Sequence, residues 1–192
     1  MLEVEIKASL AGLSPDTVAR SAAEAGFRFQ RSLREIDMYF DGISRDFKQT
    51  DEALRLRSCR DLERGGARTL LTYKGPKVDA ASSTRTEYET SVGDLETARK
   101  LLEALGFRPR FTVDKTRREF TLEGVTLCLD TVAGLGSFLE LESLTISPER
   151  REAEVTRLLS LLDGLGVSRE RLTRRSYLEM LLASNPDQER TV

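Results

Sequence analysis

The stretch Leu-Glu-Val-Glu-Ile-Lys at residues 2–7 alternates apolar and charged side chains without interruption. Neighbouring side chains of a β-strand point to opposite faces, so this alternation predicts a strand with one apolar and one charged face. Glu3, Glu5 and Lys7 share the charged face. The pattern recurs along the chain, and the fold therefore depends on whether these charged faces point to solvent or inward.

Charged side chains stand two residues apart on several later segments, and each such pair is of one sign. Single charged residues on the same or neighbouring strands complete the set. The acids are Glu3, Glu5, Glu87, Glu89, Asp130, Glu140 and Glu142. The bases are Lys7, Arg55, Arg57, Lys74, Arg85, Lys115 and Arg117. A single strand of this kind would ordinarily turn its charges to solvent. Here, however, acidic and basic pairs lie on different strands, and Thr, Ser and Gln are scarce among the charged residues. Both features argue against a simple solvent-exposed face.

Turn and capping residues divide the chain into helices and strands. Helices are expected at 15–25, 95–105, 148–165 and around 177–182, the first three preceded by the capping residues Ser14, Asp94 and Ser147. Strands are expected at 2–7, 27–40 (one long strand or a bent pair), 54–57, 69–74, 85–89, 107–120, 125–132 and 138–146. The first two helices both end in Gly-Phe, which indicates that the two halves repeat one arrangement.

About eight strands with helices available to cover their apolar face predict an α+β fold. Helices outside the apolar face would turn the charged face inward, giving a closed eight-stranded antiparallel β-barrel with a charged lumen. We expect a single domain at residues 1–183 and a disordered tail at 184–192.

Composition excludes several classes of function. The 30 Lys and Arg nearly balance the 32 Asp and Glu, a net charge of −2, which argues against nucleic-acid or membrane binding. The absence of histidine excludes a Ser-His-Asp triad and imidazole zinc ligands. With an N-terminus unlike a signal peptide and no long apolar run, the protein is expected to be soluble and cytoplasmic.

The charged lumen itself suggests a ligand. Clustered Arg and Lys suit a polyphosphate, because guanidinium groups bind phosphate oxygens in pairs and ammonium groups add charge. Clustered carboxylates suit a hard divalent cation, Mg²⁺ or Mn²⁺, that bridges them to the same phosphates.

The residues 3–7 resemble the ExExK signature of the CYTH superfamily, which is named for class IV adenylyl cyclases and thiamine triphosphatases. Further matching segments follow in the order of that superfamily, at residues 37–40, 53–57, 72–76, 85–89, 115–117, 129–130 and 135–142. The resemblance spans residues 2 to about 182 and implies a triphosphate tunnel, a barrel whose lumen binds a triphosphate with metal. Residues 45–55 and 73–76 are most similar to the class IV adenylyl cyclase branch.

The resemblance also implies roles for the residues. Metal would be held by Glu3, Glu5, Asp130, Glu140 and Glu142, and phosphates by Lys7, Arg55, Arg57, Lys74, Arg85, Lys115 and Arg117. Glu5, Asp130 and Lys7 are the expected catalytic residues, while Glu87 and Glu89 would orient the bases or bind a second metal. The helix around Tyr177 resembles a segment that partly closes one tunnel mouth, and a homodimer is expected by analogy alone.

Three functions remain open. A cyclase would convert ATP to cyclic AMP and pyrophosphate, which is the favoured reading. A triphosphatase would hydrolyse tripolyphosphate, thiamine triphosphate or a nucleotide with the same residues. A non-catalytic sensor would only bind a polyphosphate or nucleotide, and the many acidic side chains disfavour it.

Overall fold

A computed structural model describes residues 2–42, 45–77, 83–145 and 148–184 of the chain. Its strands are β1 (Leu2–Ser9), β2 (Arg28–Asp41), β3 (Ala53–Asp61), β4 (Ala67–Lys74), β5 (Arg85–Val92), β6 (Arg108–Leu122), β7 (Val125–Val132), β8 (Gly136–Thr145) and β9 (Leu172–Thr173). The α-helices are α1 (Pro15–Glu24), α2 (Leu95–Ala104), α3 (Arg151–Gly164) and α4 (Tyr177–Ser184). Two 3₁₀ turns, Pro148–Arg150 and Arg169–Arg171, flank α3.

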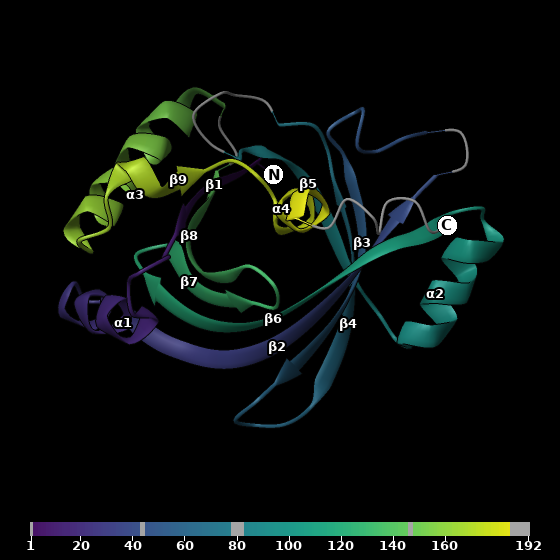
Figure 1. Ribbon diagram of the computed structural model, residues 1–192, viewed down its shortest axis with the longest axis horizontal. Helices are drawn as coiled ribbons and strands as arrows, with labels where there is room; N and C mark the ends of the chain where they lie inside the picture. Colours follow the sequence, from purple (N-terminus) through teal and green to yellow (C-terminus); the bar gives the residue numbers. More distant parts are fainter. Residues whose placement is uncertain (1, 43–44, 78–82, 146–147, 185–192) are drawn as a thin grey trace.

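The first eight strands form a closed antiparallel barrel, which confirms the predicted fold. Their order is β5-β4-β3-β2-β6-β7-β8-β1, and pairing of β1 with β5 closes the ring (Figure 1). The closing seam is short, with Leu2 opposite Thr86 and Glu3 opposite Arg85. Farther along the same edge of β1, Lys7 and Ala8 pair with β9. Closure leaves the eight barrel strands with neighbours on both sides, and their alternation separates a lumen from an outer face.

The pairing of the strands confirms the repeat that the two Gly-Phe helix ends indicate. Exchanging β1–β4 for β5–β8 reproduces the ring, because β2 pairs with its equivalent β6, and β1 with its equivalent β5. The helices α1 and α2 occupy equivalent places and begin at Ser14 and Asp94, whose side chains accept from backbone N–H groups of the first turn. Gly26 and Gly106 follow them with φ of +93° and +94°, the left-handed conformation that ends a helix.

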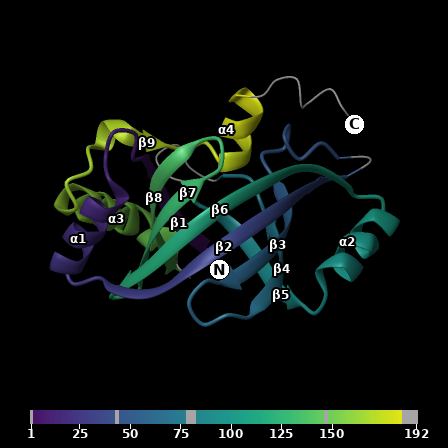
Figure 2. The ribbon, with the colours of Figure 1, turned by 60° about the horizontal axis from the view of Figure 1, so that its bottom comes forward.

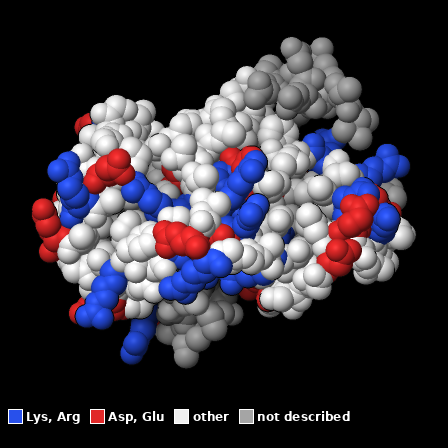
Figure 3. All heavy atoms as spheres, turned by 90° about the horizontal axis from the view of Figure 1, so that it is seen from below, with Lys and Arg blue, Asp and Glu red and all other residues white. Residues whose placement is uncertain are grey.

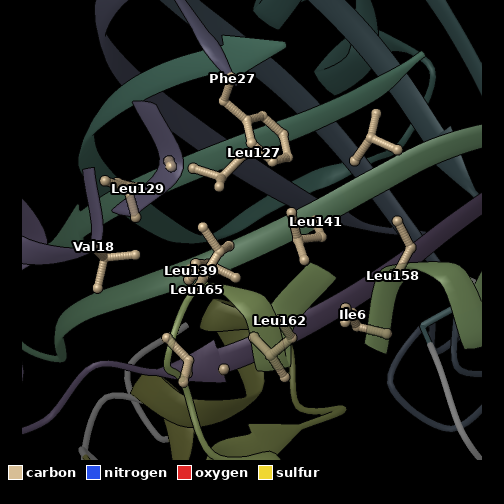
Figure 4. Packing of buried hydrophobic residues seen from close by; sticks show 14 of the residues in the cluster. Ile6, Val18, Phe27, Leu127, Leu129, Leu139, Leu141, Leu158, Leu162 and Leu165 are labelled. Carbon is tan, nitrogen blue, oxygen red and sulfur yellow. The ribbon is translucent and has the colours of Figure 1, made fainter. Parts of the chain in front are cut away.

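The main hydrophobic core lies outside the barrel wall, as the expected orientation of the charged face requires. Leu127, Leu139 and Leu141 point outward from β7 and β8 and pack against Leu158 and Leu162 of α3 (Figure 4). A second core packs α2 against the outer face around Leu56. Since α1, α2 and α3 cover the apolar faces, the charged faces of the same strands enclose the lumen.

The fourth helix packs against a different face. Tyr177 and Leu181 of α4 contact Val113, Val132 and Phe138. Val113 pairs with Asp37 across neighbouring strands, and paired residues point to the same face of a sheet. Val113 therefore points into the lumen, and α4 packs against the inner face of the barrel wall and covers one end of the lumen (Figures 1 and 2).

The start of the third expected helix differs from the prediction. The helix expected from residue 148 begins as a 3₁₀ turn, and α3 starts at Arg151 after Arg150, which makes no side-chain cap. Ser147, the expected cap, lies outside the described residues, as does the expected tail beyond Ser184. The long second strand is continuous, with register shifts at Phe29/Arg31 and Tyr39/Phe40.

On the face seen in Figure 3, acidic and basic side chains are interspersed. Among the described residues, no helix combines the length and apolar composition that crossing a membrane requires.

Replacing Asp94 by alanine should lower the free energy of unfolding by about 0.5–2 kcal/mol. Asp94 Oδ1 accepts from Thr97 N at 2.7 Å, and alanine would leave this N–H without its cap. Urea unfolding measures the change, with Asp94→Ser as the control that keeps a capping oxygen. Equal stability of the alanine and wild-type proteins would contradict the capping role.

Candidate functional site

The barrel encloses a cavity of about 830 Å³. All seven predicted bases line it, namely Lys7, Arg55, Arg57, Lys74, Arg85, Lys115 and Arg117. Of the predicted acids, Glu3, Glu5, Glu87, Glu89, Glu140 and Glu142 also line it. The alternation of charge along the strands therefore brings side chains from distant parts of the sequence to one cavity.

Arg57 is held in place from neighbouring β2. Its Nε and Nη2 donate to the two oxygens of Asp37 at 2.6 and 2.8 Å, and Nη1 lies 3.0 Å from Glu35 Oε2. Although burial acts to raise them, nearby cations lower both carboxyl pKa values, with Lys115 and Arg57 bringing that of Glu35 to about 2. Glu35 and Asp37 thus stay ionised and orient the bases of β3.

Glu35 and Asp37 did not enter the predicted set of site residues, although both line the cavity and are buried. They stand two residues apart on β2, alternating with Ile36 and Met38, so the rule used for the other strands selects them as well.

Arg55 sits beside this pair with spare hydrogen-bonding capacity. Its Nη2 donates to Thr72 at 3.3 Å and lies 3.7 Å from Glu89 Oε2. Its Nε is buried and has no hydrogen-bond partner among the described residues. A buried donor without a partner is costly, so an anion in the cavity would be stabilised here.

Asp130 of β7 binds the two bases of β6, Lys115 and Arg117. It accepts from Arg117 at 2.7 and 2.6 Å, from Lys115 at 3.0 Å and from the Tyr177 hydroxyl at 3.0 Å. Its side chain is fully buried and lies outside the set of residues lining the cavity. Asp130 does not belong to the close group of Glu3, Glu5 and Glu142, and its oxygens already face three donor side chains.

Glu140 and Lys7 connect β8 to β1. Lys7 Nζ lies 3.1 Å from Glu5 Oε1 and 3.1 Å from Glu140 Oε1, while Glu140 also contacts Arg117. Burial acts to lower the pKa of Lys7, but the two carboxylates hold it above its usual range. Lys7 is therefore a fixed positive charge in the lumen.

Glu3, Glu5 and Glu142 form a group of a different kind. One carboxylate oxygen from each lies within 4.8 Å of the other two. Burial raises the pKa of Glu142 well above its usual range, helped by the charges of Glu3, Glu140 and Glu5 and opposed by Arg117. Each of the three carboxylates also has one base beside it, at 3.0–3.6 Å: Lys74 beside Glu3, Lys7 beside Glu5 and Arg117 beside Glu142. Their oxygens are the donors that Mg²⁺ and Mn²⁺ prefer, so these residues fit a divalent cation.

Lys74 and Arg85 stand at the edge of this group. Lys74 Nζ lies 3.0 Å from Glu3 Oε2 and 2.7 Å from Glu87 Oε2. Arg85, opposite Glu3 across the closing seam, donates to the Gly75 carbonyl at 3.5 Å. The seam thus sets basic groups beside the carboxylates, the arrangement needed where a cation and an anion bind together.

Comparison with known proteins agrees with this geometry. The profile of the CYTH domain family matches residues 1–177. A Methanocaldococcus jannaschii protein named "Putative adenylate cyclase" is 37% identical over 94% of this chain and 98% of its own. "Adenylate cyclase CyaB" of Aeromonas hydrophila is 26% identical over 91% of this chain and 86% of its own.

A solved structure extends the comparison to three dimensions. The PH1819 protein of Pyrococcus horikoshii is 40% identical, with a TM-score of 0.86 over 95% of this chain and 99% of that one. The similarity covers the whole barrel and does not stop at the ExExK strand.

Proposed function

The chain belongs to the CYTH domain family, and from its charged cavity we propose that it converts ATP to cyclic AMP and pyrophosphate in a metal-dependent reaction. One observation carries the proposal: seven bases converge on a cavity in which three carboxylates gather within 4.8 Å. The names of the Methanocaldococcus and Aeromonas relatives favour a cyclase among the reactions of triphosphates.

The bases would bind the triphosphate. Arg55 and Arg57 of β3 and Lys115 and Arg117 of β6 line the cavity on the two sides of β2, with Lys7 and Lys74 adding positive charge. Asp37, Glu35 and Asp130 hold these groups before a ligand arrives, so little ordering of side chains accompanies binding.

Glu3, Glu5 and Glu142 would hold the metal ion, with Glu140 beside them as a partner of Lys7 and Arg117. A bound Mg²⁺ or Mn²⁺ would supply Lewis acidity at the phosphates and lower the pKa of a nearby hydroxyl. We assign Asp130 to the positioning of Lys115 and Arg117 instead of metal binding.

In the proposed reaction the ribose 3′ oxygen bonds to the α-phosphorus. The bond from that phosphorus to the bridging oxygen of the β-phosphate breaks, and pyrophosphate leaves while the hydroxyl proton passes to solvent. Arg and Lys side chains would neutralise the charge that develops on the phosphate oxygens. The enzyme's work is to hold the triphosphate so that the 3′ oxygen can reach the α-phosphorus.

A product assay tests the function. Purified protein would be incubated with ATP, and separately with tripolyphosphate, in Mg²⁺ or Mn²⁺, and the products resolved by chromatography. We expect cyclic AMP and pyrophosphate from ATP. Orthophosphate with ADP or pyrophosphate and no cyclic AMP would identify a triphosphatase, while binding without turnover would support a sensor; either result contradicts the cyclase.

A further inference from the structure

Tyr177, the first residue of α4, contacts three charged groups of the lumen at once. Its ring centroid lies 4.6 Å from Lys7 Nζ and 5.2 Å from Lys115 Nζ. Its hydroxyl donates to Asp130 Oδ2 at 3.0 Å. The side chain is buried, and its ring packs against that of Phe138 in a T-shaped arrangement with ring centroids 5.1 Å apart. One side chain of the helix therefore touches groups on β1, β6, β7 and β8.

The local sequence fixes where this side chain enters the barrel. Ser176 and Glu179 form a reciprocal capping box: Glu179 N donates to Ser176 Oγ at 3.1 Å, and Ser176 N donates to the Glu179 carboxylate. The helix therefore begins at Tyr177. Farther along α4, Leu181 packs against the β7–β8 turn, where a Cβ on Gly134 would lie 3.3 Å from Leu181 Cδ2. Tyr177 and Leu181 both dock the helix, whereas the contacts with the two lysines are made by Tyr177.

The surroundings of Tyr177 suit a neutral ring that orders cations. Burial, with the negative charges of Asp130 and Glu140, raises the pKa of the Tyr177 hydroxyl well above its usual range, so it remains a hydrogen-bond donor. The face of an aromatic ring attracts a cation, and more strongly where water is excluded. Because the ring covers one side of each ammonium group, the remaining N–H bonds point to carboxylates or to the cavity.

We propose that Tyr177 is a positioning residue of the phosphate-binding site, whose ring holds Lys7 and Lys115 and whose hydroxyl holds Asp130 behind Lys115 and Arg117. The inference rests on the proposed function insofar as these bases bind a triphosphate. Without the ring, the two lysine side chains regain rotamer freedom that binding must then remove. The ring and the hydroxyl act separately, since the hydroxyl supports only the β6 bases.

Calorimetric titration with metal-free tripolyphosphate tests the positioning role in Tyr177→Leu, Tyr177→Phe and Leu181→Ala. We expect Tyr177→Leu to weaken binding about tenfold, and Tyr177→Phe, which keeps the ring, about threefold or less. Leu181→Ala loosens the docking of α4 but keeps the ring and hydroxyl of Tyr177, and should bind within about twofold of wild type. Unchanged binding by Tyr177→Leu, or an equal loss in Leu181→Ala, would overturn the proposal.

A second measurement separates this inference from the function itself. In ¹H–¹³C spectra, the ring current of Tyr177 should displace the ε-methylene signals of Lys7 and Lys115, in wild type and in Tyr177→Phe alike. Tyr177→Leu should return both signals toward ordinary lysine values. If wild type fails to bind tripolyphosphate, the proposed function fails, while these signals still decide whether Tyr177 orders the lysines; undisplaced signals in wild type would refute it.

Discussion

Replacing Glu142 by glutamine should reduce metal-dependent turnover of the triphosphate by about 100-fold or more. Glu142 supplies one of three carboxylates whose oxygens lie within 4.8 Å of one another, and an amide binds a hard cation far more weakly than a carboxylate. The same change removes a carboxyl whose pKa is raised by burial and by like charges nearby. The variant should therefore fold at least as stably as wild type.

Metal-free tripolyphosphate binding should respond in the opposite direction. Glu142→Gln removes a carboxyl that can carry negative charge in the cavity, so affinity without metal should be retained or increased. Glu89→Gln is the matched control, because Glu89 lines the same cavity but lies outside the three-carboxylate group. Turnover by Glu142→Gln equal to that of Glu89→Gln would contradict the metal assignment.

The sequence predicts the barrel because its strands must alternate. Once Glu3 and Glu5 share one face, Val4 and Ile6 share the other, and helices with apolar faces decide which one is covered. Strand order is less accessible from the sequence, since the pairing of β2 with β6 joins residues about 80 apart, such as Glu35 and Lys115. The sequence indicates that order only through the repeat of its two halves, in which β2 and β6 occupy equivalent places.

The residues of the cavity could be predicted, but their partners could not. Alternation places Asp130 on the inner face, yet nothing in the sequence shows that Lys115, Arg117 and Tyr177 occupy its oxygens. Those contacts depend on how β6, β7 and α4 meet in space. A family position can therefore suggest that a carboxylate belongs to the site without distinguishing a metal ligand from a group that orients the bases.

Replacing Arg57 by methionine should lower the free energy of unfolding by about 3–5 kcal/mol. Methionine fills a similar volume, but Asp37 and Glu35, with exposed fractions of 1% and 3%, lose the guanidinium that neutralises them. The double variant Arg57→Met with Asp37→Asn should recover part of the loss, because one uncompensated charge is gone. Urea unfolding at pH 7 measures all three proteins.

The dependence of stability on pH distinguishes a lost ion pair from lost packing around Arg57. In wild type the pKa of Glu35 lies at about 2, below its unfolded value of about 4.3, so its contribution is complete above the unfolded value. That contribution falls as the pH drops toward 2 and the carboxylate binds a proton. Arg57→Met removes one of the cations that lower this pKa, so the variant should lose less stability than wild type over the same interval. Parallel curves for the two proteins would show that the guanidinium charge contributes little, and that the substitution acts through packing.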